Sequence, residues 1–216
     1  MHVIPLQTGY WNRVAAEKHF SHPLKLDWLR QHLKPPARIL DHGCGYGRLL
    51  DQLSAAGYRD VVDTDFSEKM LVQCRSRSPH LTLVRNDGRT LPFRDRTFDG
   101  VLLFTVLTCV PADIDQRELI AEVRRVLRPG GILYISDLLI NSDARNLERY
   151  ARHEENFGVY GVFELPEGVI VRHHREDWIE HLTSGFSRLA SEHFTVTTMN
   201  GNASAAFQYV GLRTSS

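Results

Sequence analysis

Short apolar runs rich in Val, Ile and Leu alternate along the chain with longer stretches in which apolar residues recur at helical spacing. Such runs, bounded by turn residues and separated by amphipathic stretches, are typical of a mostly parallel sheet covered by helices on both faces. We therefore expect a doubly wound α/β fold. The strands expected in its first part are 38–41, 60–65, 81–85, 100–104 and 132–138.

The stretches between these strands carry the end signals of helices. Ser67 is a suitable N-cap for a helix over about 68–77. Asp113 and Gln116 have capping-box spacing at the start of a helix that runs to Leu127. The pattern up to strand 132–138 therefore predicts five successive β/α units.

The last third of the chain changes character. We expect a polar helix over 143–153 and a short helix over 176–182. The stretch 160–171 is apolar but contains two glycines and a proline, so it indicates an insertion beside the sheet. Two strands, about 189–198 and 205–212, close the chain, and the Asn-Gly-Asn sequence between them favours a hairpin.

Charge and cysteine content narrow the function classes. Lys and Arg total 26, as do Asp and Glu, and this balance argues against strong nonspecific attraction to nucleic acid or to a membrane. The longest apolar run, 101–107, is too short to span a bilayer. The three cysteines are far apart, so no zinc-site spacing is present and no metal is expected. With no secretory signal, we expect a cytoplasmic protein.

A glycine-rich segment, 39–47 (Ile-Leu-Asp-His-Gly-Cys-Gly-Tyr-Gly), stands where the first strand meets a helix. Glycines there let the backbone approach a ligand closely and leave N–H groups facing it. The GxGxG spacing differs from the GxGxxG of dinucleotide-binding enzymes, whose third glycine is replaced by Arg48. Asp41 is unsuited to a pyrophosphate but suits a cation, which favours S-adenosylmethionine (SAM) with its ammonium and sulfonium. A tight turn without a ligand is the alternative.

Two further acids follow the ends of expected strands. Asp65 is placed to accept hydrogen bonds from both hydroxyls of a ribose, or else to cap the helix that follows. Asp87-Gly88 follows the third strand, where a side chain reaches an adenine amino group; a simple turn is the alternative. Both positions agree with a ligand that contains a nucleoside.

Five motifs, in one order and at one spacing, resemble those of the class I SAM-dependent methyltransferases, in particular the small-molecule branch. They are 39–47, 65–71, 87–88 with 91–93, 98–99 and 127–131. The resemblance covers about half of the chain. It implies a Rossmann-like, mostly parallel seven-stranded sheet with a reversed last strand, and SAM as the cofactor.

The resemblance also implies roles for individual residues. An aromatic N-terminal segment closes over the cofactor in similar enzymes, although Tyr10 and Trp11 would equally pack the first helix onto the domain. The resemblance places Asp41, Gly43, Cys44 and Gly45 against the methionine part of SAM, with Phe104 and Thr105 near the sulfonium. It places Asp65 on the ribose, Phe66 and Met70 beside the adenine, and Asp87 on the adenine amino group next to Gly88 or Arg89. The residues implied for the cover are Tyr10, Trp11, His19 and Phe20.

On this basis the chain, 1–216, is expected to be a single methyltransferase domain. Its parts are an N-terminal helical cover (1–36), a cofactor-binding core (37–140), a substrate-side insertion (141–188) and closing strands (189–216).

Methyl transfer requires alignment of the acceptor with the donor, and a base if the accepting atom carries a proton. His173-His174, after the apolar insertion, are the expected base, with a cap or surface role as the alternative. Cys109 stands after the fourth strand, where several relatives have a histidine. The residues expected to line the substrate space are Cys109, Tyr160, Phe163 and Arg172.

Absent motifs favour a small-molecule acceptor. The chain has no Asn-Pro-Pro-Tyr sequence, no paired-cysteine arrangement and no basic tail, so a nucleic-acid partner is not favoured and no membrane partner is expected. Two alternatives stay open: a nucleic-acid or protein methyltransferase with a cleft lined by Arg124, Arg125 and Arg128, and a SAM-binding regulator without catalysis. The sequence does not predict the oligomeric state.

Overall fold

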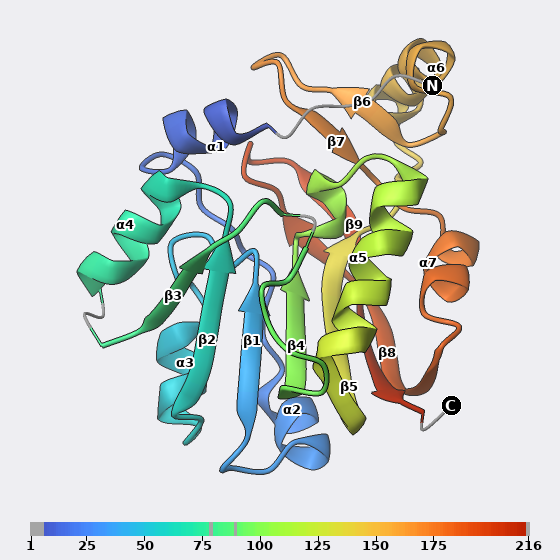
Figure 1. Ribbon diagram of the computed structural model, residues 1–216. Coiled ribbons are helices and arrows are strands. Elements are labelled where there is room, and N and C mark those ends of the chain that lie inside the picture. Colours follow the sequence, from blue (N-terminus) through green and yellow to red (C-terminus); the bar gives the residue numbers. More distant parts are fainter. Residues whose placement is uncertain (1–6, 78–79, 89, 215–216) are drawn as a thin grey trace.

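A seven-stranded sheet forms the centre of the computed structural model, which describes residues 7–77, 80–88 and 90–214. Its strands are β1 (Arg38–His42), β2 (Asp60–Asp65), β3 (Thr82–Arg85), β4 (Phe98–Phe104), β5 (Leu127–Leu138), β8 (Phe186–Thr197) and β9 (Ala203–Arg213). They stand in the order β3-β2-β1-β4-β5-β9-β8 (Figure 1). Strands β1 to β5 run parallel, whereas β9 is antiparallel to both neighbours. The expected mostly parallel sheet with a reversed last strand is confirmed.

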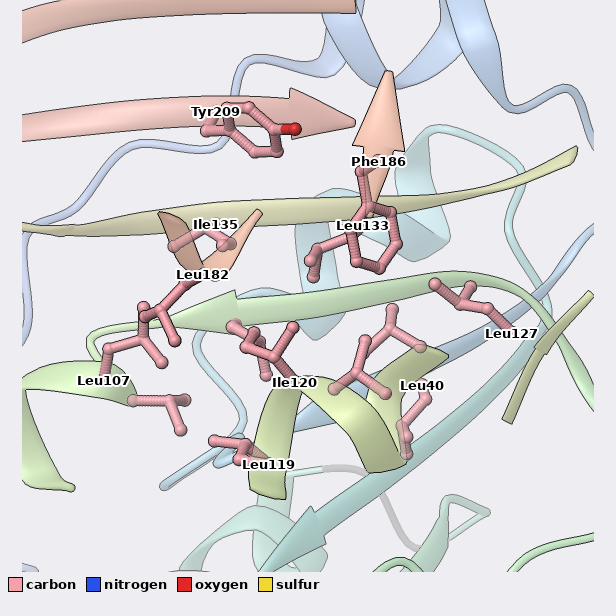
Figure 2. Packing of buried hydrophobic residues seen from close by; sticks show 14 of the residues in the cluster. Leu40, Leu107, Leu119, Ile120, Leu127, Leu133, Ile135, Leu182, Phe186 and Tyr209 are labelled. Carbon is pink, nitrogen blue, oxygen red and sulfur yellow. The ribbon is translucent and has the colours of Figure 1, made fainter. Parts of the chain in front are cut away.

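Helices cover both faces of the sheet (Figure 1). On one face, α5 and α7 pack against Leu40 and Leu133, as Figure 2 shows. On the other, α2 and α3 cover Ile39 and Tyr134. Adjacent residues of β1 thus enter opposite cores, as the alternation of a strand requires. The helices are α1 (Thr8–Val14), α2 (Leu26–His32), α3 (Leu50–Ala55), α4 (Glu68–Arg77), α5 (Asp113–Val126), α6 (Ala144–Phe157), α7 (Glu176–Leu182) and a single 3-10 turn, η1 (Leu107–Cys109).

The apolar stretch after α6 contains a small antiparallel hairpin, β6 (Val162–Glu164) and β7 (Ile170–Arg172). Both the hairpin and α6 stand beyond the carboxyl ends of the parallel strands (Figure 1). Because ligands of open α/β sheets bind at that edge, the hairpin and α6 become walls of the candidate site.

Helix α5 begins at Asp113, but the expected capping box does not form. Gln116 is fully buried instead, and its Nε2 donates to the carbonyl oxygens of Leu107 (2.9 Å) and Val110 (2.7 Å). Its Oε1 accepts a hydrogen bond from Trp178 Nε1 at 2.7 Å. The amide therefore joins η1, α5 and α7, because a buried polar group must find partners where it lies.

Candidate functional site

A cavity, hereafter the first cavity, lies at the carboxyl ends of β1, β2 and β4, beneath the N-terminal segment. It contains most of the cofactor residues expected from the sequence. Those on its wall are Trp11, Phe20, Asp41, Gly43, Cys44, Gly45, Asp65, Phe66, Met70, Gly88, Phe104 and Thr105. Cys109, which was expected to line the substrate space, is on this wall as well.

The glycine-rich loop is built around Asp65. Gly45 N–H donates to Asp65 Oδ2 at 2.9 Å, and Ser67 N–H donates to Asp65 Oδ1 at 2.8 Å. Gly43 and Gly45 have φ angles of 72° and 57°, in the left-handed region that favours glycine. A Cβ on Gly43 would lie 2.6 Å from Val106 Cγ2. The loop conformation thus depends on glycine, and it holds the Asp65 carboxylate at the cavity wall.

Asp41 is a buried acid on the same wall, 1% exposed. Its Oδ2 has no hydrogen-bond partner among the described residues. Burial raises the pKa of Asp41 to about 7, against the lowering effect of Arg48. An unpartnered carboxylate oxygen in a dry wall is a site for a cation, whose charge would offset the cost of burying the ionised form.

A second cavity, of about 730 Å³, adjoins the first. Its volume lies within the range common for small-molecule sites. The walls come from the N-terminal segment, α6, the β6–β7 hairpin and the turn between β8 and β9. The residues that line both cavities are Trp11, Phe20, Thr105 and Cys109.

His173 is on the wall of the second cavity and is 3% exposed. Its Nδ1 lies 2.5 Å from the Tyr150 hydroxyl, which also accepts a hydrogen bond from the Asn141 N–H. Burial, followed by the charge of Arg149, holds the pKa of His173 well below its usual value. The imidazole is therefore neutral near pH 7 and able to act as a proton acceptor.

His22, which the sequence did not single out, lines the same cavity. Its Nδ1 lies 2.9 Å from Ser136 Oγ, and burial lowers its pKa to about 3. It is a second neutral imidazole at the site.

Several expected site residues lie elsewhere. His174 is fully buried, with Nε2 2.9 Å from Gln116 Nε2 and Nδ1 3.0 Å from the Leu138 carbonyl oxygen. Both ring nitrogens therefore contact polar groups of the protein interior, and the side chain does not line the cavity. Arg172 turns its guanidinium to Asp113 Oδ1 (2.6 Å) and the Pro111 carbonyl (3.0 Å). These two expectations are corrected because neighbouring elements offer both side chains buried polar partners.

The remaining differences concern Asp87, Tyr160 and the N-terminal cover. Asp87 Oδ1 accepts from the Thr90 N–H at 2.9 Å, which is the turn alternative, and Gly88 takes the position on the wall. Tyr160 packs its ring against Tyr150 rather than lining either cavity. Tyr10 and His19 likewise line neither cavity; their rings contact Trp11 and Tyr46 respectively. Arg89 lies outside the described residues.

A basic face of α6 is the largest feature that the sequence did not reveal. Arg145, Arg149 and Arg152 line the second cavity. Their spacing of four and three residues places them on one side of a helix, which is a signal the sequence contains. Which side of the helix meets the cavity depends on the position of α6 in the fold.

The described residues contain neither a candidate metal site nor a candidate membrane span. Within 7–77, 80–88 and 90–214, no group of three or more His, Cys, Asp or Glu side chains is arranged to hold a metal ion. None of the helices in these ranges has the length and apolar character that a bilayer crossing requires.

Comparison with known proteins gives the family. Residues 40–135 match the family model described as a methyltransferase domain. A solved SAM-dependent methyltransferase from Methanosarcina mazei has the same fold, with a TM-score of 0.81 and 24% identity over 89% of this chain and 99% of that one. Residues 40–135 therefore belong to the methyltransferase domain family, and the chain has the fold of a SAM-dependent methyltransferase.

Relatives of this chain differ in how much of it they match. The eEF1A lysine and N-terminal methyltransferase of Mus musculus is 37% identical over 113 residues, which are 48% of this chain but 16% of that protein. The 27-O-demethylrifamycin SV methyltransferase of Amycolatopsis mediterranei is 28% identical over 217 residues, 96% of this chain and 76% of that protein. The chain thus spans less than a fifth of the length of the mouse relative.

Proposed function

We propose that this methyltransferase transfers a methyl group from SAM to a small-molecule acceptor, with SAM in the first cavity and the acceptor in the second. The observation that carries the proposal is the common wall of Trp11, Phe20, Thr105 and Cys109. Methyl transfer is an in-line displacement, so donor and acceptor must be aligned with water excluded. Two adjoining cavities with one shared wall meet that requirement.

The residues of the first cavity fit SAM, which supplies when bound a methyl group activated by its sulfonium. Asp41 offers a buried carboxylate oxygen to the cationic methionine part. At Gly45 a Cβ would project toward Phe20 and Met70, each 3.9 Å away, so its absence leaves room for the ligand. In the proposed arrangement Asp65 holds the ribose, Phe66 and Met70 flank the adenine, and the backbone at Gly88 meets the adenine edge.

The pH dependence of SAM binding should report on Asp41. Its pKa is raised to about 7, so the side chain is mostly neutral at pH 6 and mostly ionised at pH 8. The affinity for the cationic ligand should therefore rise about tenfold between these pH values, measured by calorimetry. The same raised pKa means that Asp41 stabilises the free protein at low pH, and that this contribution is lost as the pH rises through 7.

Asp41→Asn is the control for this prediction, because it removes the titrating group and keeps the shape. The variant should bind more weakly at pH 8 and should lack the rise, while titration of the ligand itself affects both proteins alike. An equal rise in the variant would contradict the role of Asp41.

His173 is the proposed general base for an acceptor that must lose a proton. This role requires the tautomer with the proton on Nδ1, donated to the Tyr150 oxygen, so that Nε2 is free to accept. His173→Gln should lower turnover about a hundredfold and leave SAM affinity unchanged, as measured by release of S-adenosylhomocysteine. The comparison is His22→Gln; if only that variant loses turnover, His22 is the base.

Two observations favour a small acceptor over a macromolecule. The second cavity is a hollow with walls from four parts of the chain, and its volume of about 730 Å³ is that of a small-molecule site. Two of the three arginines expected to line an open cleft are engaged: Arg125 pairs with Glu122 and Asp95 at 2.7 and 2.8 Å, and Arg128 pairs with Asp99 at 2.5 Å. The rifamycin enzyme, by its name, acts on a small molecule and matches nearly the whole chain.

The first experiment is calorimetric titration with SAM, S-adenosylhomocysteine and NAD. Micromolar binding of the first two without NAD, followed by mass-spectrometric detection of methylated small acceptors, supports the proposal. Lack of binding by both SAM and its product overturns it. Tight SAM binding without turnover across a broad acceptor set favours the regulator alternative.

A further inference from the structure

The walls of the second cavity combine apolar side chains with one arginine, Arg149, that forms no ion pair within 4 Å among the described residues. Phe163, Leu165, Val171 and Met199 supply much of the apolar surface. The guanidinium of Arg149 lies over the ring of Phe163, with its carbon 3.7 Å from the ring centroid. A guanidinium stacked in this way keeps the N–H groups of its edge available for a ligand.

The other cations of this wall are already paired. Lys18 Nζ lies 3.2 Å from Glu167 Oε1, Arg152 pairs with Glu148, and Arg145 lies 3.8 Å from Asp143. For Arg149, by contrast, no carboxylate of the described chain lies within salt-bridge distance, and its buried Nε has no partner there. Burial of an uncompensated charge is costly, so an anion supplied by the ligand would be strongly favoured.

We infer that the methyl acceptor is an amphipathic carboxylic acid whose carboxylate binds Arg149 and whose apolar body lies against Phe163, Val171 and Met199. The inference rests on the proposed function and names its substrate class. One unpaired arginine matches one negative charge, which favours a carboxylate over a doubly charged phosphate.

The position of Arg149 also orients the acceptor. Arg149 lines the second cavity but not the first, whereas Thr105 and Cys109 belong to the wall that both cavities share. With the carboxylate held at Arg149, the part of the acceptor that reaches the shared wall lies where the methyl group arrives. The carboxylate therefore anchors the acceptor, and a different nucleophilic atom receives the methyl group.

The experiment uses the full-length protein saturated with S-adenosylhomocysteine. Calorimetry compares three probes, phenylpropionate, indole-3-acetate and decanoate, each with its primary amide and its phosphonate. At least one acid should bind ten to a hundred times more tightly than its amide, the range expected for hydrogen bonds to a charged group. That preference should vanish in Arg149→Gln and be reduced in Arg149→Lys, which keeps the charge but loses the planar fork.

Arg152→Gln is the matched control on the same helix, because the charge of Arg152 is already taken up by Glu148; it should keep the preference for the acid. Unchanged affinity of the variants for S-adenosylhomocysteine shows that they are folded. The inference is overturned if no acid binds more tightly than its amide, if Arg149→Gln keeps the preference, or if phosphonates bind best. Since S-adenosylhomocysteine binding is measured in the same protein, failure of this inference is separate from failure of the proposed function.

Discussion

Asp65→Ala should reduce SAM affinity about a hundredfold or more, measured by calorimetry. The carboxylate is expected to accept hydrogen bonds from the ribose, and each hydrogen bond to a charged group contributes about 1.5–3 kcal/mol. The substitution also removes the acceptor of the Gly45 N–H, 2.9 Å from Oδ2, which holds the glycine-rich loop. Ligand contact and loop geometry are therefore lost together.

Asp60→Ala is the control for this prediction, since Asp60 is an exposed acid at the other end of the same strand. Its only ion pair in the described chain is a 3.8 Å contact with Arg38. The control should bind SAM as the wild type does. Wild-type affinity in Asp65→Ala would exclude the ribose role.

Gly161→Ala should lower the free energy of unfolding by about 3 kcal/mol or more, measured by chemical denaturation. Gly161 has a φ of 98°, and a Cβ there would lie 2.3 Å from the His173 carbonyl oxygen. Because the obstacle is backbone, it can be relieved only by moving β7 away from the residues before β6. Turnover should fall as well, since His173 directly follows β7 and would be displaced with it.

Gly168→Ala separates the strain of an alanine at positive φ from the clash of its Cβ with neighbouring backbone. Gly168 has a φ of 85° in the same hairpin, but its nearest neighbour to a Cβ is Glu164 Oε1 at 3.8 Å. In this variant the free energy of unfolding should fall by only about 1 kcal/mol, which is the strain of an alanine in the left-handed region. Equal losses in the two variants would show that the close approach at Gly161 has no part in stability.

The sheet and the first cavity were predictable because both depend on local signals. Buried parallel strands require apolar runs, and the loop after β1 requires glycine at positions of positive φ such as Gly43. Asp65 ends β2 and Asp41 is next to the last residue of the neighbouring parallel strand β1, so a single edge of the sheet had to bring them together. The strand β5 begins earlier than expected, at Leu127, because residues 128–131 form an irregularity between two paired stretches of β4 and β5.

The second cavity was less predictable because its walls depend on how distant elements meet. In extended backbone, successive side chains point to opposite sides, so adjacent histidines cannot both face one cavity. Which of them does so is decided by the contact of His174 with Leu139, a pairing of residues far apart in sequence. The place of Arg149 was equally hard to predict. The helical spacing of the three arginines of α6 is a local signal, but the side of α6 that meets the cavity is fixed only by the β6–β7 hairpin packed against it.

The shared wall gives the protein an optical reporter of its own. The chain has three tryptophans, and Trp11 is the one that lines both cavities. Trp28 lies on α2 and packs near Tyr134, and Trp178 lies on α7. Indole emission depends on the polarity and contacts of the ring. With Trp28 and Trp178 replaced by phenylalanine, the remaining fluorescence would respond when either ligand displaces water from the indole. The sequence in which donor and acceptor arrive could then be followed in stopped-flow traces without a label.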